Sequence, residues 1–258
     1  MGSRKQQLQA FERLLDIMDE LREKCPWDRK QTFETLRHLT IEEPYELGDA
    51  ILEDDLEEIK KELGDLLLHV VFYSKIGSEK KAFDIADVTN QIADKLIYRH
   101  PHIYGETQVE DADQVVKNWE NIKLKEGKKS VLEGVPKSLP ALVKAYRIQD
   151  KVSGIGFDWD KTEAVLDKVK EELEELRTEG DAGDSKKMEA ELGDVIFSLV
   201  NYARFLKINP ENALERTNKK FIKRFNYIEG KAKKSQRKIS ELSIEEMEIL
   251  WQEAKKTD

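Results

Sequence analysis

The sequence predicts an all-α protein built from two tandem helical domains. Apolar residues recur at the i, i+3, i+4, i+7 spacing of an amphipathic helix, for example in segments 8–21 and 165–176. No stretch shows the sustained apolar–polar alternation of a half-buried strand. Several short motifs also occur twice in the same order, which is typical of a duplicated domain.

Six features follow one another in each half of the chain. The first half contains CPWD at 25–28, EEPYE at 42–46, ELGD at 62–65, an apolar run at 66–76, the basic pair Lys95/Arg99 and the pair Trp119/Lys123. The second half contains FDWD at 157–160, EELEE at 171–175, ELGD at 191–194, an apolar run at 195–208, Lys220/Arg224 and Trp251/Lys255. The last Glu of EExxE lies at the same separation from the Asp of ELGD in both halves, so the copies are expected to fold alike.

The segment 126–140, EGKKSVLEGVPKSLP, has the Gly and Pro content of a linker. It divides the chain into an N-terminal domain, 1–125, and a C-terminal domain, 141–258. Neither half is long enough to build a large core alone. We therefore expect cores of the four-helix-bundle type that are completed by dimerisation, within the chain or between chains, with a homodimer as the expected assembly.

Composition limits the classes of partner. The net charge of −9 argues against a general electrostatic surface for nucleic acid. The one cysteine, Cys25, cannot form an intramolecular disulfide and fits a reducing compartment. The longest apolar run, 66–76, is too short to span a bilayer, and the first ten residues carry no apolar signal segment. We expect a soluble cytoplasmic protein with no membrane partner.

The EExxE and ELGD motifs each place two carboxylates at i, i+3, which puts both on one face of a helix. The residues are Glu43, Glu46, Glu62 and Asp65 in the first half and Glu172, Glu175, Glu191 and Asp194 in the second. If the two helices of one half pack antiparallel, four inward carboxylates repel one another. A divalent cation relieves this repulsion, and oxygen-only ligands favour Mg²⁺ before Mn²⁺ or Ca²⁺.

Other interpretations of these motifs have to be weighed. Acidic runs on helices are usually solvated faces, and a single EExxE would be explained in that way. Here the spacing is kept in both copies although the intervening residues differ, which favours a functional set. The glycines of ELGD, Gly64 and Gly193, either admit a ligand or backbone to the carboxylate face or pack against another helix, and both explanations stay open.

Beyond these patterns, the sequence resembles the MazG family of nucleoside triphosphate pyrophosphohydrolases. The resemblance runs from about Leu8 to Lys255 and rests on the duplicated motifs together with CPWDRKQT, EEPYELGDAI, RHPHIYG, SLPAL and GFDW. It implies Mg²⁺-dependent hydrolysis of (deoxy)nucleoside triphosphates between the α and β phosphates, with Mn²⁺ as a substitute. The implied metal ligands are Glu172, Glu175, Glu191 and Asp194, and the first-half set keeps the same residue types.

Cations indicate which half carries the chemistry, because a polyphosphate brings negative charge into an acidic site. Lys168 and Lys187 stand where the first half has Leu39 and Glu58. The C-terminal half is therefore expected to be the principal catalytic domain. The resemblance places nucleotide-contacting residues at Lys168, Lys187, Lys220, Arg224 and Trp251, and Lys255 follows Trp251 by one helical turn.

Two roles are less well defined by the sequence. Glu171, the remaining member of EExxE, is a candidate for orienting or deprotonating the attacking water, with a solvent-facing glutamate as the alternative. Trp251 is expected to stack on the base, with a helix anchor in the core as the alternative.

The sequence shows no hydrogen-bonding pocket for one base and no P-loop, GxxxxGK[ST]. We therefore expect broad base tolerance and a role in nucleotide-pool housekeeping. Two alternatives stay open. One is a narrower dUTPase-like or modified-nucleotide pyrophosphohydrolase, and the other is a helical regulator that binds nucleotides without turnover.

Overall fold

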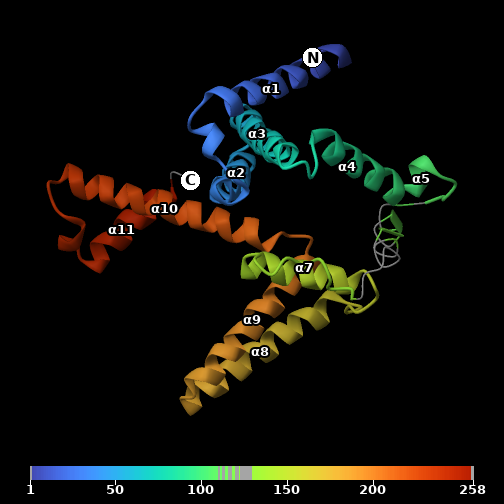
Figure 1. Ribbon diagram of the computed structural model, residues 1–258. Helices are drawn as coiled ribbons and strands as arrows, with labels where there is room; N and C mark the ends of the chain where they lie inside the picture. Colours follow the sequence, from blue (N-terminus) through green and yellow to red (C-terminus); the bar gives the residue numbers. More distant parts are fainter. Residues whose placement is uncertain are drawn as a thin grey trace. The chain divides into compact units, whose positions relative to one another are not determined.

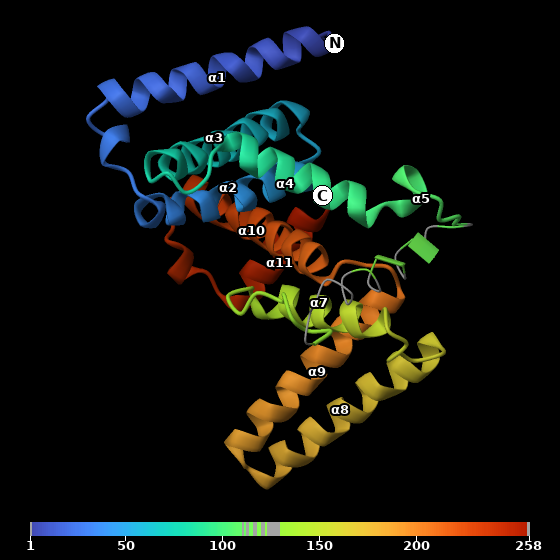
Figure 2. The ribbon, with the colours of Figure 1, turned by 45° about the vertical axis from the view of Figure 1, so that its right-hand side comes forward.

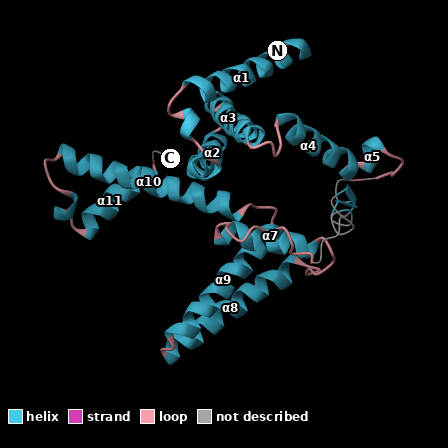
Figure 3. Ribbon diagram, in the orientation of Figure 1, coloured by secondary structure: helices cyan, strands magenta, loops and turns pink. Residues whose placement is uncertain are grey.

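The computed structural model describes residues 2–109 and 130–256, and between these segments residues 111, 114, 115, 118, 119 and 122. Every regular element in this part of the chain is a helix, and none of the described residues lies in a strand (Figure 3). The predicted all-α class is confirmed. Lys123 and residues 126–129, to which the sequence assigns part of a motif and of the linker, lie outside the described residues.

The chain divides into two compact units, Met1–Gln108 and Val109–Asp258 (Figure 1). Each unit is built around one helical hairpin that carries EExxE on its first helix and ELGD on its second, and in the first unit ELGD occurs once more at 46–49, overlapping EExxE. The domain boundaries 1–125 and 141–258 stay predictions.

The first unit contains five helices and a short 3₁₀ turn at Asp28–Lys30 among its described residues. The helices are α1 (Arg4–Lys24), α2 (Phe33–Glu53), α3 (Leu56–Glu79), α4 (Ile85–Arg99) and α5 (Pro101–Tyr104). The α2 and α3 helices form the central hairpin, and α1 and α4 both pack against α3. The core lies between α1, α2 and α3 and contains the buried residues Met18, Leu36, Val71, Phe72 and Ile76.

The second unit repeats the hairpin and adds a second one. Its helices are α7 (Ala141–Ser153), α8 (Thr162–Ala182), α9 (Ser185–Phe205), α10 (Pro210–Lys234) and α11 (Ile244–Lys255). The α8 and α9 helices run side by side over most of their length (Figure 2), and α7 packs on α9. The α10 and α11 helices form the second hairpin.

The same two-residue turn closes the carboxylate-bearing hairpin in each unit. Asp54 ends α2 with φ 56°, and Gly183 ends α8 with φ 72°, so both adopt the left-handed conformation common at helix C-termini. The next residue, Asp55 or Asp184, caps the following helix by accepting hydrogen bonds from two backbone amides. This tight turn brings the EExxE helix and the ELGD helix face to face.

Part of the predicted linker is held against the second unit. Lys151 on α7 is buried, and its Nζ donates to the carbonyls of Val131, at 2.9 Å, and Glu133, at 3.4 Å. A buried ammonium requires such acceptors, because burying it unpaired would be costly. The segment around residues 131–133 is therefore attached to α7.

Candidate functional site: paired carboxylate hairpins

Each hairpin gathers three glutamates from its two helices. In the second unit, ligand atoms of Glu172, Glu175 and Glu191 all lie within 4.8 Å of one another. The first two project from α8 and the third from α9, so one helix supplies the i, i+3 pair and the other faces it. The spacing argument from the sequence therefore identified residues that the fold brings together.

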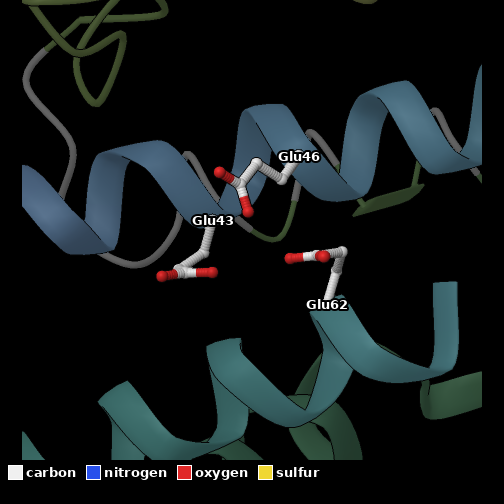
Figure 4. A group of neighbouring side chains, drawn as sticks. All are labelled: Glu43, Glu46 and Glu62. Atoms are coloured by element: carbon white, nitrogen blue, oxygen red, sulfur yellow. The ribbon is translucent and has the colours of Figure 1, made fainter. Parts of the chain in front are cut away.

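The first unit contains the equivalent group, Glu43, Glu46 and Glu62, under the same 4.8 Å limit. Figure 4 shows the first two on one helix and Glu62 on the facing helix, with their carboxylates in the space between them. Oxygen atoms at these separations can share one hard divalent cation.

The aspartates of ELGD stand slightly apart from these groups. Neither Asp65 nor Asp194 belongs to the set of mutually close ligand atoms. Asp194 nevertheless lines the same cavity as Glu172 and contributes to the electrostatics of Glu191. Its role as a fourth metal ligand stays a prediction.

Repulsion between the carboxylates raises the pKa of one glutamate in each group. Burial and the neighbouring charges of Glu175, Asp194 and Glu172 raise the pKa of Glu191 above its ordinary value. In the first unit, the charge of Glu62 is the main cause that raises the pKa of Glu46. In each group, therefore, the neighbouring carboxylates oppose the ionisation of one glutamate.

One carboxylate oxygen shows the need for a cation directly. Glu62 is 1% exposed, and its Oε1 accepts a hydrogen bond from Lys61 at 2.9 Å. Its Oε2 is also buried and has no partner in the described part of the chain. A buried charged oxygen without a partner is destabilising, and a bound cation would satisfy it. The residues present therefore fit a divalent metal ion.

In each unit one lysine pairs with one buried glutamate. The pair lies on the second helix of the hairpin in the first unit and on the first helix of the hairpin in the second unit. In the second unit Lys168 on α8 contacts both Glu171 and Glu172 at 2.8 Å, and these two carboxylates raise its pKa. In the first unit Lys61 on α3 pairs with Glu62, whose pKa falls below its ordinary value mainly because of this contact.

Lys61 was missed by comparing the two halves, because its counterpart in the second copy is Ala190. The signal available in the sequence was its position directly before ELGD. Lys187, predicted near the carboxylates, pairs instead with Glu179 at 3.4 Å near the hairpin turn.

The other predicted nucleotide-binding residues lie on α10 and α11. Arg224 stacks its guanidinium 5.4 Å from the ring centroid of Trp251, whose ring also packs 5.1 Å from that of Phe221. Lys220 and Lys255 are exposed on the same two helices. None of Lys220, Arg224, Trp251 and Lys255 lines the cavity beside Glu172.

A polar network distinguishes the first unit from the second. His69 is buried, its Nδ1 lies 2.9 Å from the hydroxyl of Thr40, and its Nε2 lies 3.5 Å from Glu43. Tyr73 contacts the same Thr40 hydroxyl at 2.6 Å. The second unit has Ser198 in place of His69. In the first unit, side chains inside the hairpin therefore hold Glu43 in position. In the second unit, the corresponding region is open space.

That space is a cavity of about 590 Å³ between α7, α8 and α9. Its walls are mostly apolar and aromatic, and Lys168, Glu172 and Asp194 contribute polar groups to it. Sequence reasoning missed Gln149 and Asn201, which also line it. No motif marks either residue, because the cavity forms only when three helices pack together.

Among the described residues, no helix is both long enough and apolar enough to cross a membrane.

The glycines of the ELGD motifs at 62–65 and 191–194 face open space. A Cβ added at Gly64 or Gly193 would meet nothing within 4 Å. Within the described part of the chain, therefore, neither a backbone nor a side chain makes the close approach that the sequence led us to consider.

The fold and the carboxylate groups define an all-α protein whose duplicated hairpins each present a group of glutamates that could hold a metal ion. A family model described as the MazG nucleotide pyrophosphohydrolase domain matches residues 31–104 and 160–228, which include both hairpins. The chain belongs to this MazG family.

Similar proteins extend over nearly the whole chain. A nucleoside triphosphate pyrophosphohydrolase of Escherichia coli (strain K12) is 40% identical over 260 residues, covering 97% of this chain and 99% of that protein. The "Nucleoside triphosphate pyrophosphohydrolase/pyrophosphatase MazG" of Thermotoga maritima is 44% identical over 253 residues, covering 96% of each. A crystal structure of a mazG-related protein from Thermotoga maritima matches with 26% identity and a TM-score of 0.39, covering 44% of this chain and 98% of that one.

The raised pKa of Glu191 predicts a stability change that reverses with metal. An acid whose pKa is raised on folding destabilises the native state once the pH exceeds that pKa. In a metal chelator at pH 7, Glu191→Gln should therefore raise the melting temperature. In excess Mg²⁺ the wild type should gain more stability than the variant, because binding to the native state is stabilising.

Glu189→Gln is the matched control, because Glu189 is exposed on the same helix and outside the glutamate group. It should shift neither melting curve appreciably. A lower melting temperature of Glu191→Gln in chelator would contradict the repulsion inferred here.

Proposed function

We propose that the protein hydrolyses nucleoside triphosphates between the α and β phosphates, releasing a nucleoside monophosphate and pyrophosphate, with Mg²⁺ as the natural metal and Mn²⁺ as a substitute. The observation that carries this proposal is the group Glu172, Glu175 and Glu191 within 4.8 Å, with Lys168 beside it. Hard oxygen donors are suited to Mg²⁺, and Mg²⁺ is the usual partner of a polyphosphate. Membership of the MazG family and the printed names of the relatives support the same activity.

The proposed metal ligands are Glu172, Glu175, Glu191 and Asp194. A divalent ion held there would neutralise charge on the phosphate oxygens and lower the pKa of a bound water. The carboxylates fix its position from two helices that a tight turn holds together. The raised pKa of Glu191 is consistent with a ligand that is stabilised in its charged form only when a cation is present.

The remaining groups are assigned roles in substrate binding and proton transfer. Lys168 lies beside the glutamates and is placed to contact a phosphate oxygen. The side chain of Glu171 is 55% exposed, and it accepts a hydrogen bond from Lys168. It is therefore accessible to a water molecule, which it would orient or deprotonate. The further substrate-binding residues in this proposal are Lys187, Lys220, Arg224, Trp251 and Lys255.

We assign the principal active site to the second unit. In the first unit Lys61 engages Glu62 directly, and His69 lies against Glu43, so two of the three glutamates already have protein partners. The second unit instead combines its glutamates with an open cavity next to Lys168. The group Glu43, Glu46 and Glu62, with Asp65, is proposed as a second metal site.

We further propose broad base tolerance, a role in nucleotide-pool housekeeping and a cytoplasmic location. The hairpin charges recognise phosphates, which all nucleoside triphosphates share, and this supports tolerance of the base. Comparable rates across ATP, GTP, CTP, UTP and their deoxy forms would agree with it. A rate confined to one base would favour the narrower dUTPase-like alternative.

A homodimer is also proposed, on the basis of a repeated apolar stripe. In the second unit Leu192, Ile196 and Leu199 on α9 are between 46% and 48% exposed. The corresponding residues of α3 in the first unit, at positions 63, 67 and 70, are also exposed and apolar. Exposed apolar stripes at matching positions favour helical packing with a second copy, which would complete four-helix bundles.

Sedimentation equilibrium tests this assembly. The expected mass is twice the 30.0 kDa of the chain. Ile196→Glu places a charge on the stripe and should shift the mass toward that of one chain. A wild type that sediments as a single chain would contradict the dimer.

For the activity itself, incubation with GTP and Mg²⁺ should yield pyrophosphate. Glu191→Ala or Asp194→Ala should reduce its release by about 10²-fold or more, because a preorganised charge-stabilising group is lost. Glu62→Ala should retain most of the activity, since it lies in the other unit.

The products and the variants test separate parts of the proposal. Orthophosphate in place of pyrophosphate would refute cleavage between the α and β phosphates. Absence of any product would support a nucleotide-binding regulator without turnover. Loss of activity in Glu62→Ala with retention in Glu191→Ala would reverse the assignment of the principal site.

A further inference from the structure

The glutamate group of the first unit differs from its counterpart in the side chains that surround it. When the ELGD motifs of α3 and α9 are aligned, Thr40 of α2 corresponds to Val169 and His69 of α3 corresponds to Ser198. In the first unit, Thr40 and His69 contact each other across the two helices of the hairpin. Valine offers no hydrogen-bonding group in its side chain, so the second unit cannot form the same contact.

We propose that His69 is a positioning residue that holds Glu43 for a divalent cation, so that the α2–α3 hairpin binds its ion more tightly than the α8–α9 hairpin when no nucleotide is present. The ion of the first unit is then structural, because it ties α2 to α3. This inference rests on the two metal sites proposed above. It adds the residue that positions one of them and the order in which they fill.

The orientation of the imidazole follows from its neighbours. Nε2 of His69 lies 3.5 Å from Oε1 of Glu43. A nitrogen lone pair in this place would face the carboxylate and be repelled, so Nε2 carries the hydrogen and Nδ1 is the acceptor. The hydroxyl of Thr40 lies 2.9 Å from Nδ1 and therefore donates to it. The imidazole thus links α2 to Glu43 through both of its nitrogens.

The hydroxyl of Tyr73 completes this chain of donors. It lies 2.6 Å from Oγ1 of Thr40 and donates to it, because Thr40 uses its one hydroxyl hydrogen toward His69. The carbonyl of Leu36 also lies 3.0 Å from the hydroxyl of Thr40, but a helical carbonyl in this position already accepts a backbone amide. Three donors therefore point in one direction, and the chain ends on Glu43.

A proline inside α2 makes this connection more important. Pro44 directly follows Glu43 and has no N–H, so the carbonyl of Thr40 loses its usual partner one turn further along the helix. The second unit has Leu173 at the corresponding position. The side chain of Thr40 joins α2 to His69 at the turn where the hydrogen-bond ladder of α2 is interrupted. The carboxylate helix is thereby fixed where its own backbone is weakest.

Glu62 provides the observation that points to an ion. Its side chain is 1% exposed, and its Oε2 is buried and has no partner within the described part of the chain. Figure 4 shows its carboxylate directed into the space that it shares with Glu43 and Glu46. Lys61 contacts the other oxygen, Oε1, and its own side chain is 61% exposed. The ammonium group therefore keeps much of its hydration and leaves Oε2 to a cation.

Preorganisation favours tight binding in the first unit. His69 contacts one oxygen of Glu43, and Lys61 contacts one oxygen of Glu62. Because these side chains are already held, less conformational freedom is lost when their other oxygens bind an ion. Residues that orient metal ligands contribute roughly 10–100-fold to metal affinity. The contacts that leave little room for a substrate in this hairpin are thus suited to a retained ion.

The second unit holds fewer members of its group in this way. Lys168 contacts Glu172 at 2.8 Å, and among the described residues this is the one member with a basic partner. Ser198, at the position of His69, donates to the carbonyl of Val195 within its own helix, at 2.9 Å. It therefore does not connect α9 to the glutamates of α8. The ion of this unit is held more weakly until a nucleotide adds its phosphate oxygens.

Titration of the full chain with Mn²⁺ in the absence of nucleotide tests the inference, with free Mn²⁺ measured by electron paramagnetic resonance. The wild type should show two classes of site that differ in affinity by about tenfold or more. His69→Leu should weaken the tighter class by about tenfold or more, because leucine cannot donate to Glu43. His69→Gln should restore most of this affinity, since its amide can donate to Glu43 and accept from Thr40.

Further variants assign each class to a hairpin and provide the control. Glu62→Ala should remove the tighter class, and Glu191→Ala should remove the weaker one. His38→Leu makes the same chemical change as His69→Leu at an exposed histidine of α2, and it should change neither class. Thermal melting of each variant in a metal chelator shows whether it is folded before Mn²⁺ is added.

Four results would overturn the inference. The first is a wild type whose two sites have equal affinity, and the second is removal of the tighter class by Glu191→Ala. The third is unchanged Mn²⁺ affinity in His69→Leu. The fourth is a loss in His69→Leu that His69→Gln does not restore, which would show that the imidazole serves packing alone. Because this titration uses no nucleotide, a failure of pyrophosphate release would remain a separate result that concerns the proposed function.

Discussion

Electrostatic repulsion between glutamates on facing helices is the constraint around which each hairpin is organised. A two-residue turn forces the EExxE helix against the ELGD helix and brings three carboxylates within 4.8 Å. One lysine compensates part of this charge in each unit. The remaining charge raises the pKa of Glu191 and of Glu46, and Oε2 of Glu62 has no partner among the described residues. The hairpin thus gathers carboxylates whose mutual repulsion a bound cation would relieve.

The two copies solve the same problem with different residues. Within the carboxylate groups, the most buried glutamate is Glu62 on α3 in the first unit and Glu172 on α8 in the second. The compensating lysine follows the buried carboxylate, as Lys61 in one copy and Lys168 in the other. The first unit fills its hairpin interior with the network around His69, and the second opens a cavity there. The two copies therefore share the hairpin and its glutamates but differ in the side chains around them.

Sequence periodicity was sufficient to predict the helices and the grouping of the glutamates, because i, i+3 spacing determines which side chains share a helical face. It did not show which glutamate is buried or that Lys61 pairs with Glu62, since these depend on how the two helices pack. Gln149 was equally hidden, because an isolated glutamine forms no sequence pattern. It stands out only because its buried Oε1 has no partner among the described residues. The open space at Gly193 likewise appears only in three dimensions.

The central claim is that the α8–α9 hairpin holds a divalent cation among its glutamates. Crystals grown with Mn²⁺ and measured at the manganese absorption edge test it most directly, because the anomalous signal locates the ion without assumptions about activity. The account predicts a peak bound by carboxylate oxygens of Glu172, Glu175 and Glu191. Manganese absent from that hairpin while it occupies other sites on the protein would contradict the account.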